Sequence, residues 1–405
     1  MYRAYVAMSL LVIASTAVAQ PNALTEEMAV QIGLSRDPVL QRTEGTITQA
    51  QSDVIAAKTW PNPEFQYERE TLENGVDIVE QKFVLSQRFD VSGRRGLRKQ
   101  AAGHHLNAAR FESDAWRAEL TKEIRQRYYS SLRQQMRRQV YKTMQARIRV
   151  LSNALQKRRQ EGDVSIYDYQ RVKTARAAID AEVRNVEVDY QSEWQSLWAL
   201  LGTGTQNFQS LEGQLSPDPI RPLDELIASL NHQPGLRQLR EQTDGFTLQQ
   251  RAESRTFPDV TLGLGVKQEE IADQTFDGLV INASLPIPIF DRRKDKQTRY
   301  QAEALITQSR YQLALTKASA EVKGLWMQST QYQRSAEMFR EDAIQGTQDL
   351  MKTAEVYYRA GEIGILGLLD AYRGALNAEL NALDLEFKAR TAQIKLDYLT
   401  GGTVQ

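Results

Sequence analysis

Residues 112–150 read ESDAWRAELTKEIRQRYYSSLRQQMRRQVYKTMQARIRV and lie inside a tract, from about Gly93 to Glu161, that contains no proline. No glycine lies between Gly103 and Gly162. The tract is rich in Ala, Gln, Glu, Arg and Leu, which are good helix formers. At about 1.5 Å per residue, one unbroken helix of this length would span roughly 100 Å. Ordinary globular domains do not contain such helices, so the tract predicts a rod or a tunnel wall.

Large apolar residues recur along this tract at every fourth position. Each step turns the helix by roughly 400°, so the row moves around the helix by about 40° per step. A two-stranded coiled coil would keep its apolar seam on one side. The pattern therefore favours a helix packed on more than one side, as in a bundle or barrel. The residues of the row are Trp116, Leu120, Ile124, Tyr128, Leu132, Met136, Val140, Met144 and Ile148.

Glycines and prolines indicate that the chain contains one plan twice. The glycine turns at Gly162 and Gly361 are 199 residues apart, and a second helical pattern follows each turn. Upstream, Pro61 and Pro258 are 197 residues apart. An internal repeat of about 200 residues explains both spacings.

The expected organisation follows from this repeat, with short helices before each hairpin. The chain divides into a signal peptide at 1–19, repeat 1 at 20–215, a linker at 216–222 and repeat 2 at 223–405. Repeat 1 has a β-hairpin at about 64–91, a long helix at about 93–161 and a helix at about 165–201. In repeat 2 these elements cover about 259–290, 292–359 and 364–399.

Before each long helix, the spacing of apolar residues changes from a helical period to alternation at every second residue. Val260, Leu262 and Leu264 alternate with polar residues or glycine, as do Phe83 and Leu85 in repeat 1. Such segments are half-buried strands, either of a soluble antiparallel sheet or of a membrane barrel. Four strands cannot close a membrane barrel, which needs about eight, whereas a trimer would supply twelve.

The predicted fold is therefore mainly α with a small β part. It is an internally duplicated unit of a strand hairpin plus a long helical hairpin, and three copies would supply the strands of a 12-stranded β-barrel. The apolar row of each strand then faces lipid and the polar row faces water. The hairpin loops, Leu72–Asp77 and Gln268–Phe276, would lie outside the cell.

Both junctions between a strand and a long helix are basic. Cations oppose the macrodipole at a helix N-terminus, so solvation of the helix alone does not explain them. Anionic headgroups at the inner face of a membrane would attract them. Ser92 and Asp291 are the expected N-caps. The residues expected at the membrane interface are Arg94, Arg95, Arg98, Arg292, Arg293 and Lys294.

Composition argues against several classes of function. The 51 basic and 51 acidic residues balance, which gives no support for a nucleic-acid partner. The chain has no cysteine, so we expect neither a thiolate metal site nor N-terminal lipidation. With three histidines, no phosphate loop and no nucleophile–base pair, we expect no catalytic residues, cofactor or bound metal, and hence no enzyme.

The N-terminus has the features of a secretory signal. Arg3 precedes the apolar stretch Met8–Val18, and Ala17-Val18-Ala19 fits a small-residue cleavage pattern. No later segment offers the roughly 20 apolar residues of a membrane helix. The mature chain is expected to leave the cytoplasm, and either to float in the periplasm or to enter a membrane as strands.

Several short stretches, in the same order as the repeated plan, resemble the TolC-like outer-membrane efflux proteins of Gram-negative bacteria. They are Lys58-Thr59-Trp60-Pro61-Asn62-Pro63, Leu85-Ser86-Gln87-Arg88-Phe89, Leu285-Pro286-Ile287-Pro288-Ile289-Phe290 and Tyr358-Arg359-Ala360-Gly361. The resemblance covers essentially the whole mature chain. It implies a homotrimer in outer-membrane lipid, trimerising into a 12-stranded β-barrel joined to a periplasmic α-helical barrel that forms a long tunnel. It also implies passive conduction through a channel that opens with a periplasmic adaptor, with the energy supplied by an inner-membrane pump that we expect to be proton-driven.

The same resemblance implies a closed periplasmic tip at the two glycine turns. In this family an acidic ring lines the narrow entrance, and a tyrosine helps to latch it. Two departures weaken the match: Gly367 stands at a second acidic position, and Ile363 at the usual basic one. The implied tip residues are Gly162, Asp168, Tyr358, Gly361 and Asp370.

The stretch 85–98 resembles the heavy-metal cation efflux branch, and export of drugs or other small molecules is the alternative. A soluble periplasmic coiled-coil adaptor or scaffold is the alternative of another class. It would explain the helices and the signal, but not four alternating strands with basic junctions.

Overall fold

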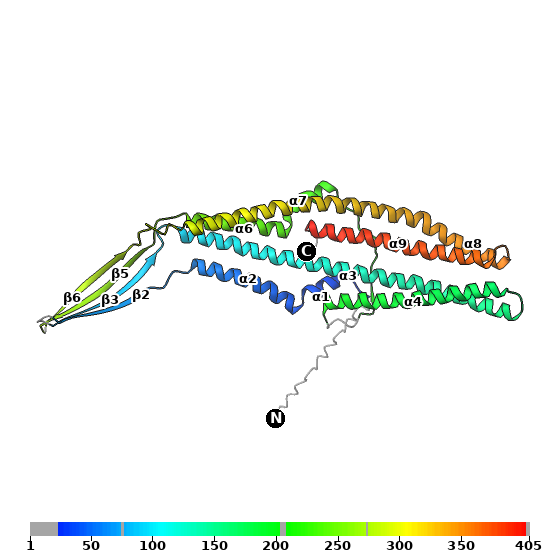
Figure 1. Cartoon of the computed structure of the whole chain (residues 1–405), viewed down its shortest axis with the longest axis horizontal. Coiled ribbons are helices and arrows are strands. Elements are labelled where there is room, and N and C mark those ends of the chain that lie inside the picture. Colours follow the sequence, from blue (N-terminus) through cyan, green and yellow to red (C-terminus); the bar gives the residue numbers. More distant parts are fainter. Residues whose placement is uncertain (1–22, 74–76, 203–207, 273, 402–405) are drawn as a thin grey trace, which may run out of the picture.

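The computed structural model describes residues 23–73, 77–202, 208–272 and 274–401. The chain is strongly elongated (Figure 1): a sheet lies at one end, and two helical hairpins turn at the other. The predicted signal peptide and its cleavage site lie outside the described residues. Within the described ranges no helix combines the length and the apolar character needed to cross a membrane.

The elements follow the predicted duplication. Repeat 1 contains β1 (Ala23–Leu24), α1 (Glu26–Leu34), α2 (Asp37–Lys58), β2 (Glu64–Glu73), β3 (Asp77–Phe89), α3 (Arg94–Gln160), α4 (Ile166–Leu201) and β4 (Ser210–Leu211). Repeat 2 contains α5 (Leu223–Ser229), η2 (Leu230–His232), α6 (Pro234–Glu253), β5 (Val260–Ile271), β6 (Gln274–Ser284), α7 (Lys294–Phe339), η3 (Arg340–Ile344), α8 (Gln345–Ala360) and α9 (Ile365–Leu399).

The first long helix is continuous, as predicted. Helix α3 contains 67 residues and contacts α1, α2, α4, α6 and α9, which explains why its apolar row moves around the helix. Of that row, Ile124, Tyr128 and Leu132 are almost fully buried. The prediction of a helix packed on several sides is confirmed.

The second long helix extends from Lys294 to Ala360, but it contains a π-turn that the prediction did not include. Between α7 and α8 the five residues Arg340–Ile344 form a π-helix. Because each π-turn holds more residues than an α-turn, it can take up an inserted residue within a helix. The helical tract is nevertheless equally long in both repeats: α3 contains 67 residues, and α7, the π-helix and α8 contain 46, 5 and 16.

The predicted N-caps are also wrong by one or two residues. The residue preceding α3 is Gly93, with φ 76°, and the residue preceding α7 is Arg293, with φ 59°. In repeat 1 the carboxylate of Asp90, not Ser92, accepts the backbone N–H of Arg95. Asp291 instead accepts the N–H of Arg293 itself, at 2.8 Å.

The four long strands form one antiparallel sheet in the order β2-β3-β5-β6. One face, here called the apolar face, contains the in-register row Phe65, Leu85, Leu264 and Ile281, and all four side chains are exposed. The other, the polar face, contains an ion-pair ladder in which Glu80 accepts from Lys82 and Lys267. The predicted alternation is confirmed, although the last strand ends at Ser284 rather than near 290.

The reason for this early end is chemical. Pro286 and Pro288 have no backbone N–H to donate to a sheet. The segment 285–290 therefore leaves the sheet as an exposed connection to α7, with Phe290 97% exposed.

Candidate functional site

The tip farthest from the sheet is built by two glycine turns (Figure 1). Gly162 and Gly361 have φ 89° and 79°, a left-handed conformation that costs glycine little. Each turn reverses the chain into a second helix, α4 in repeat 1 and α9 in repeat 2. The two predicted turn residues thus occupy corresponding places.

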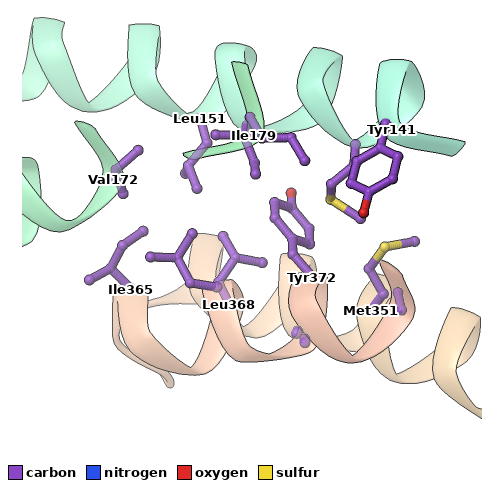
Figure 2. Packing of buried hydrophobic residues seen from close by; sticks show 14 of the residues in the cluster. Tyr141, Leu151, Val172, Ile179, Met351, Ile365, Leu368 and Tyr372 are labelled. Atoms are coloured by element: carbon purple, nitrogen blue, oxygen red, sulfur yellow. The ribbon is translucent and has the colours of Figure 1, made fainter. Parts of the chain in front are cut away.

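Apolar side chains join the two hairpins above these turns. Leu151 and Val172 of repeat 1 lie across from Ile365 and Leu368 of repeat 2, with Tyr372 one turn farther along (Figure 2). All five side chains are almost fully buried. Burial of each large aliphatic side chain contributes about 1.5–3 kcal/mol, so the hairpins of one protomer are held together mainly by this cluster.

The structure brings Asp168 and Tyr358 into one neighbourhood. The Ser165 hydroxyl accepts the N–H of Asp168 at 3.1 Å and lies 2.8 Å from its carboxylate. Tyr358 packs against the apolar cluster. Burial raises the pKa of Tyr358; the charge of Arg158 opposes this shift and that of Asp168 adds to it. Tyr358, the predicted latch residue, therefore lies close enough to Asp168, a predicted acidic position, for the Asp168 charge to affect its pKa.

Asp370 is exposed and has no ion pair or hydrogen bond with any side chain in the described ranges. It borders a groove of about 680 Å³ between α4 and α9, which Arg171 and Arg373 also line. Arg171 donates to the Tyr167 hydroxyl at 2.5 Å rather than to Asp370. The predicted acidic position is thus accessible, with two guanidinium groups lining the same groove.

A polar network near the tip was not predicted. Glu355 of α8 accepts from Arg147 of α3 and from the Tyr372 hydroxyl of α9, both at 3.0 Å, and Arg359 lies 3.8 Å away. Burial, and secondly the Glu355 carboxylate, raise the pKa of Tyr372 to about 12. The spacing of Glu355 and Arg359 was visible in the sequence, but nothing there indicated Arg147.

At the other end of the helices, three of the six predicted interface residues are neutralised by carboxylates within the chain. Glu253, which is buried, accepts from Arg98 at 2.7 Å and from Arg293 at 3.0 Å. Burial would raise the pKa of Glu253, but these two hydrogen bonds hold it below its ordinary value. Arg94 is buried and pairs with Asp259 at 2.6 Å. These ion pairs link repeat 1 to repeat 2.

Because Arg94 is buried, it cannot contact a lipid headgroup, and its predicted place at the membrane interface is wrong. For the more accessible residues of the predicted basic junction, the membrane interface stays a prediction. Arg95 stacks on Trp60, with the guanidinium carbon 4.0 Å from the ring centre, and Trp60 contacts Phe89 of the apolar face. Lys294 is exposed without a carboxylate partner among the described residues. Arg292 is also exposed, but it lines a pocket beside the polar face.

The arrangement of a small sheet above two very long helical hairpins defines a class of outer-membrane protein. The solved structure of the outer membrane protein VceC from Vibrio cholerae has this fold, with a TM-score of 0.74 and 18% identity over 93% of this chain and 96% of that chain. Residues 229–402 match the sequence family described as outer membrane efflux protein. Repeat 2 is therefore similar in sequence to this family, and the described chain shares the fold of VceC.

Two relatives cover most of the sequence. The cobalt-zinc-cadmium resistance protein CzcC of Cupriavidus metallidurans is 24% identical over 93% of this chain and 90% of its own length. The nickel-cobalt-cadmium resistance protein NccC of Alcaligenes xylosoxydans xylosoxydans is 22% identical over 72% of this chain and 67% of its own length.

Proposed function

We propose that this chain is one subunit of a trimeric outer-membrane channel that passively conducts heavy-metal cations out of the cell. The observation that carries the proposal is the four-stranded sheet, whose outer strands β2 and β6 each have one unpaired edge among the described residues. Three copies joined edge to edge would give twelve strands, with the exposed apolar face toward lipid. The helices would then form the periplasmic tunnel.

The partners follow from this placement. The tip formed by Gly162 and Gly361 would meet a periplasmic adaptor, and an inner-membrane pump, which we expect to be proton-driven, would supply the energy. Arg95, Trp60 and Lys294 would contact the inner leaflet of the outer membrane, where aromatic and basic side chains are favoured.

Heavy-metal cations are the proposed cargo because both relatives are named for resistance to such metals. A strain lacking the gene should become sensitive to cobalt, zinc, cadmium or nickel salts, and the wild-type gene should restore resistance. Sensitivity only to detergents and dyes would instead identify the channel as an exporter of organic molecules.

The oligomeric state provides the direct test of the channel itself. Detergent-extracted protein should have the mass of a trimer and appear as a long tapered tube by scattering and negative-stain imaging. A monomer that is soluble without detergent would contradict the channel and favour the periplasmic adaptor or scaffold.

We also propose that Asp370 forms an acidic ring at the entrance, where three carboxylates would attract cations. In a planar bilayer, Asp370→Ala should lower the cation-to-anion permeability ratio several-fold, whereas the exposed control Lys352→Gln should leave it nearly unchanged. An unchanged ratio in Asp370→Ala would exclude this role.

A further inference from the structure

The proposed channel gives a role to the periplasmic tip and to the residues at the membrane interface. It gives none to a pocket at the base of the sheet. This pocket has a volume of about 610 Å³. It lies where β3 ends, β5 begins and the segment 285–293 crosses from β6 to α7. Its lining includes Arg88, Thr261 and Ser284 from the sheet and Arg292 from the crossing segment.

Three of these side chains are aligned by strand pairing. Arg88 of β3 lies opposite Thr261 of β5, and Thr261 lies opposite Ser284 of β6. Because residues paired in register share a face, all three belong to the polar face. The sheet therefore holds one guanidinium group and two hydroxyl groups in a row.

The charges of the pocket do not cancel. Among its carboxylates, Asp259 is paired with Arg94 at 2.6 Å, and Asp291 accepts the backbone N–H of Arg293. Arg293 is itself paired with Glu253. Arg88 and Arg292 are exposed, and neither has an ion pair within the described ranges. Two positive charges are thus left without an ion pair, beside one negative charge on Asp291.

Guanidinium groups fit tetrahedral oxyanions well, because their planar N–H groups can donate to two oxygens at once. The Thr261 and Ser284 hydroxyl groups make no side-chain hydrogen bond with the described residues, so both can donate to a ligand. Two guanidinium groups and two hydroxyl groups supply donors of the kind that a phosphate or sulfate oxyanion accepts from.

We propose that this pocket binds a free inorganic oxyanion. The binding site is inferred from the geometry of a single chain, whereas its effect on ion permeation rests on the proposed trimeric channel. In the trimer, the polar face lines the lumen, and three pockets would make a basic band at the neck between sheet and tunnel. The neck would then favour anions, so metal cations that enter past Asp370 would cross it together with counter-anions.

Binding is tested on detergent-extracted protein by calorimetry, with inorganic phosphate and sulfate as probes. Arg88→Gln and Arg292→Gln should each weaken binding by about tenfold, and the double variant should abolish it. Lys352→Gln removes one exposed positive charge near the tip and should bind as the wild type does. Arg88→Lys keeps the positive charge but loses the planar N–H groups of the guanidinium. Its affinity for phosphate should lie between those of the wild type and Arg88→Gln.

The consequence is tested in planar bilayers under a salt gradient. The double variant should have a several-fold higher cation-to-anion permeability ratio than the wild type. Equal unfolding temperatures would confirm that the variants are folded. If the folded wild type bound neither phosphate nor sulfate, the proposed site would be refuted. The same result would follow if a carboxylate of a neighbouring protomer occupied the pocket. A binding monomer would support the site while refuting the trimeric channel.

Discussion

The two repeats have the same order of strand hairpin and long helical hairpin, but their long helices differ in continuity. In repeat 1, α3 runs without interruption, and its entry turn uses Gly93. In repeat 2, the corresponding helix is divided by the π-helix Arg340–Ile344, and its entry turn uses Arg293 in a left-handed conformation. Duplication thus preserved the path of the chain, while the polar contacts that fix each copy diverged.

The junction shows this divergence most clearly. Glu253 of repeat 2 holds one arginine from each repeat, whereas Ala56 stands 197 residues earlier, at the corresponding place in repeat 1. The acidic partner of the basic cluster is therefore present in only one copy. Glu253 of repeat 2 thus holds the starts of both long helices, and replacing it should have the largest effect on the free energy of unfolding.

Replacing Glu253 with Ala should lower the free energy of unfolding by about 2–4 kcal/mol, because Arg98 and Arg293 lose a buried shared carboxylate. Thermal unfolding followed by tryptophan fluorescence measures the change. Glu362→Ala, at an exposed position, serves as the control and should change stability by less than about 0.5 kcal/mol. Equal unfolding temperatures for the two variants would refute the anchoring role of Glu253.

The two entry turns allow a matched exchange. Gly93→Ala should cost about 1–2 kcal/mol, because a β-carbon is disfavoured in the left-handed region. At the equivalent turn, Arg293→Ala and Arg293→Gly both lose the ion pair with Glu253, but only the alanine variant keeps the backbone strain. The glycine variant should therefore be more stable by about 1 kcal/mol.

Denaturation of all three variants under one condition measures these differences. If the alanine and glycine variants at 293 were equally stable, the left-handed conformation would not be a source of strain there.

The smallest expected effect concerns the link between the hairpins. Tyr372→Phe should cost about 1 kcal/mol at neutral pH by removing the hydrogen bond to Glu355. The pKa of Tyr372 is raised from 10.0 to about 12, so the folded chain holds this proton more tightly than the unfolded chain. Its contribution to stability is therefore constant below about pH 10 and falls as the pH rises toward 12.

Unfolding of wild type and Tyr372→Phe across this pH range gives the measurement. The wild type should lose stability more steeply than the variant between pH 10 and 12. Parallel curves would show that the Tyr372 phenol does not titrate differently in the folded and unfolded chains.

Much of this fold could be predicted because its signals are local. Pro61 and Pro258 mark the strand entries, Gly162 and Gly361 mark the turns, and alternating residues such as Leu262 and Leu264 mark the strands. The π-helix could not be predicted, since Arg340–Ile344 contains neither proline nor glycine.

The candidate sites were predicted less completely, because they depend on distant pairs. The basic residues were recognised as a cluster, but their partners Glu253 and Asp259 lie 155 and 165 residues from Arg98 and Arg94. No periodicity in the sequence indicates such contacts. Conversely, the turn residues Gly162 and Gly361 were found directly, since their conformation depends on the local chain.

The order of strands in the sheet also sets the timing of biogenesis. Strand β3 pairs with β5, and the paired residues Lys82 and Lys267 are 185 positions apart. During secretion the first hairpin therefore emerges long before its partner strand exists, with Phe65 and Leu85 exposed to solvent. Unpaired strand edges with apolar side chains aggregate readily. We therefore expect the chain to be most prone to aggregation while only its first half has been delivered.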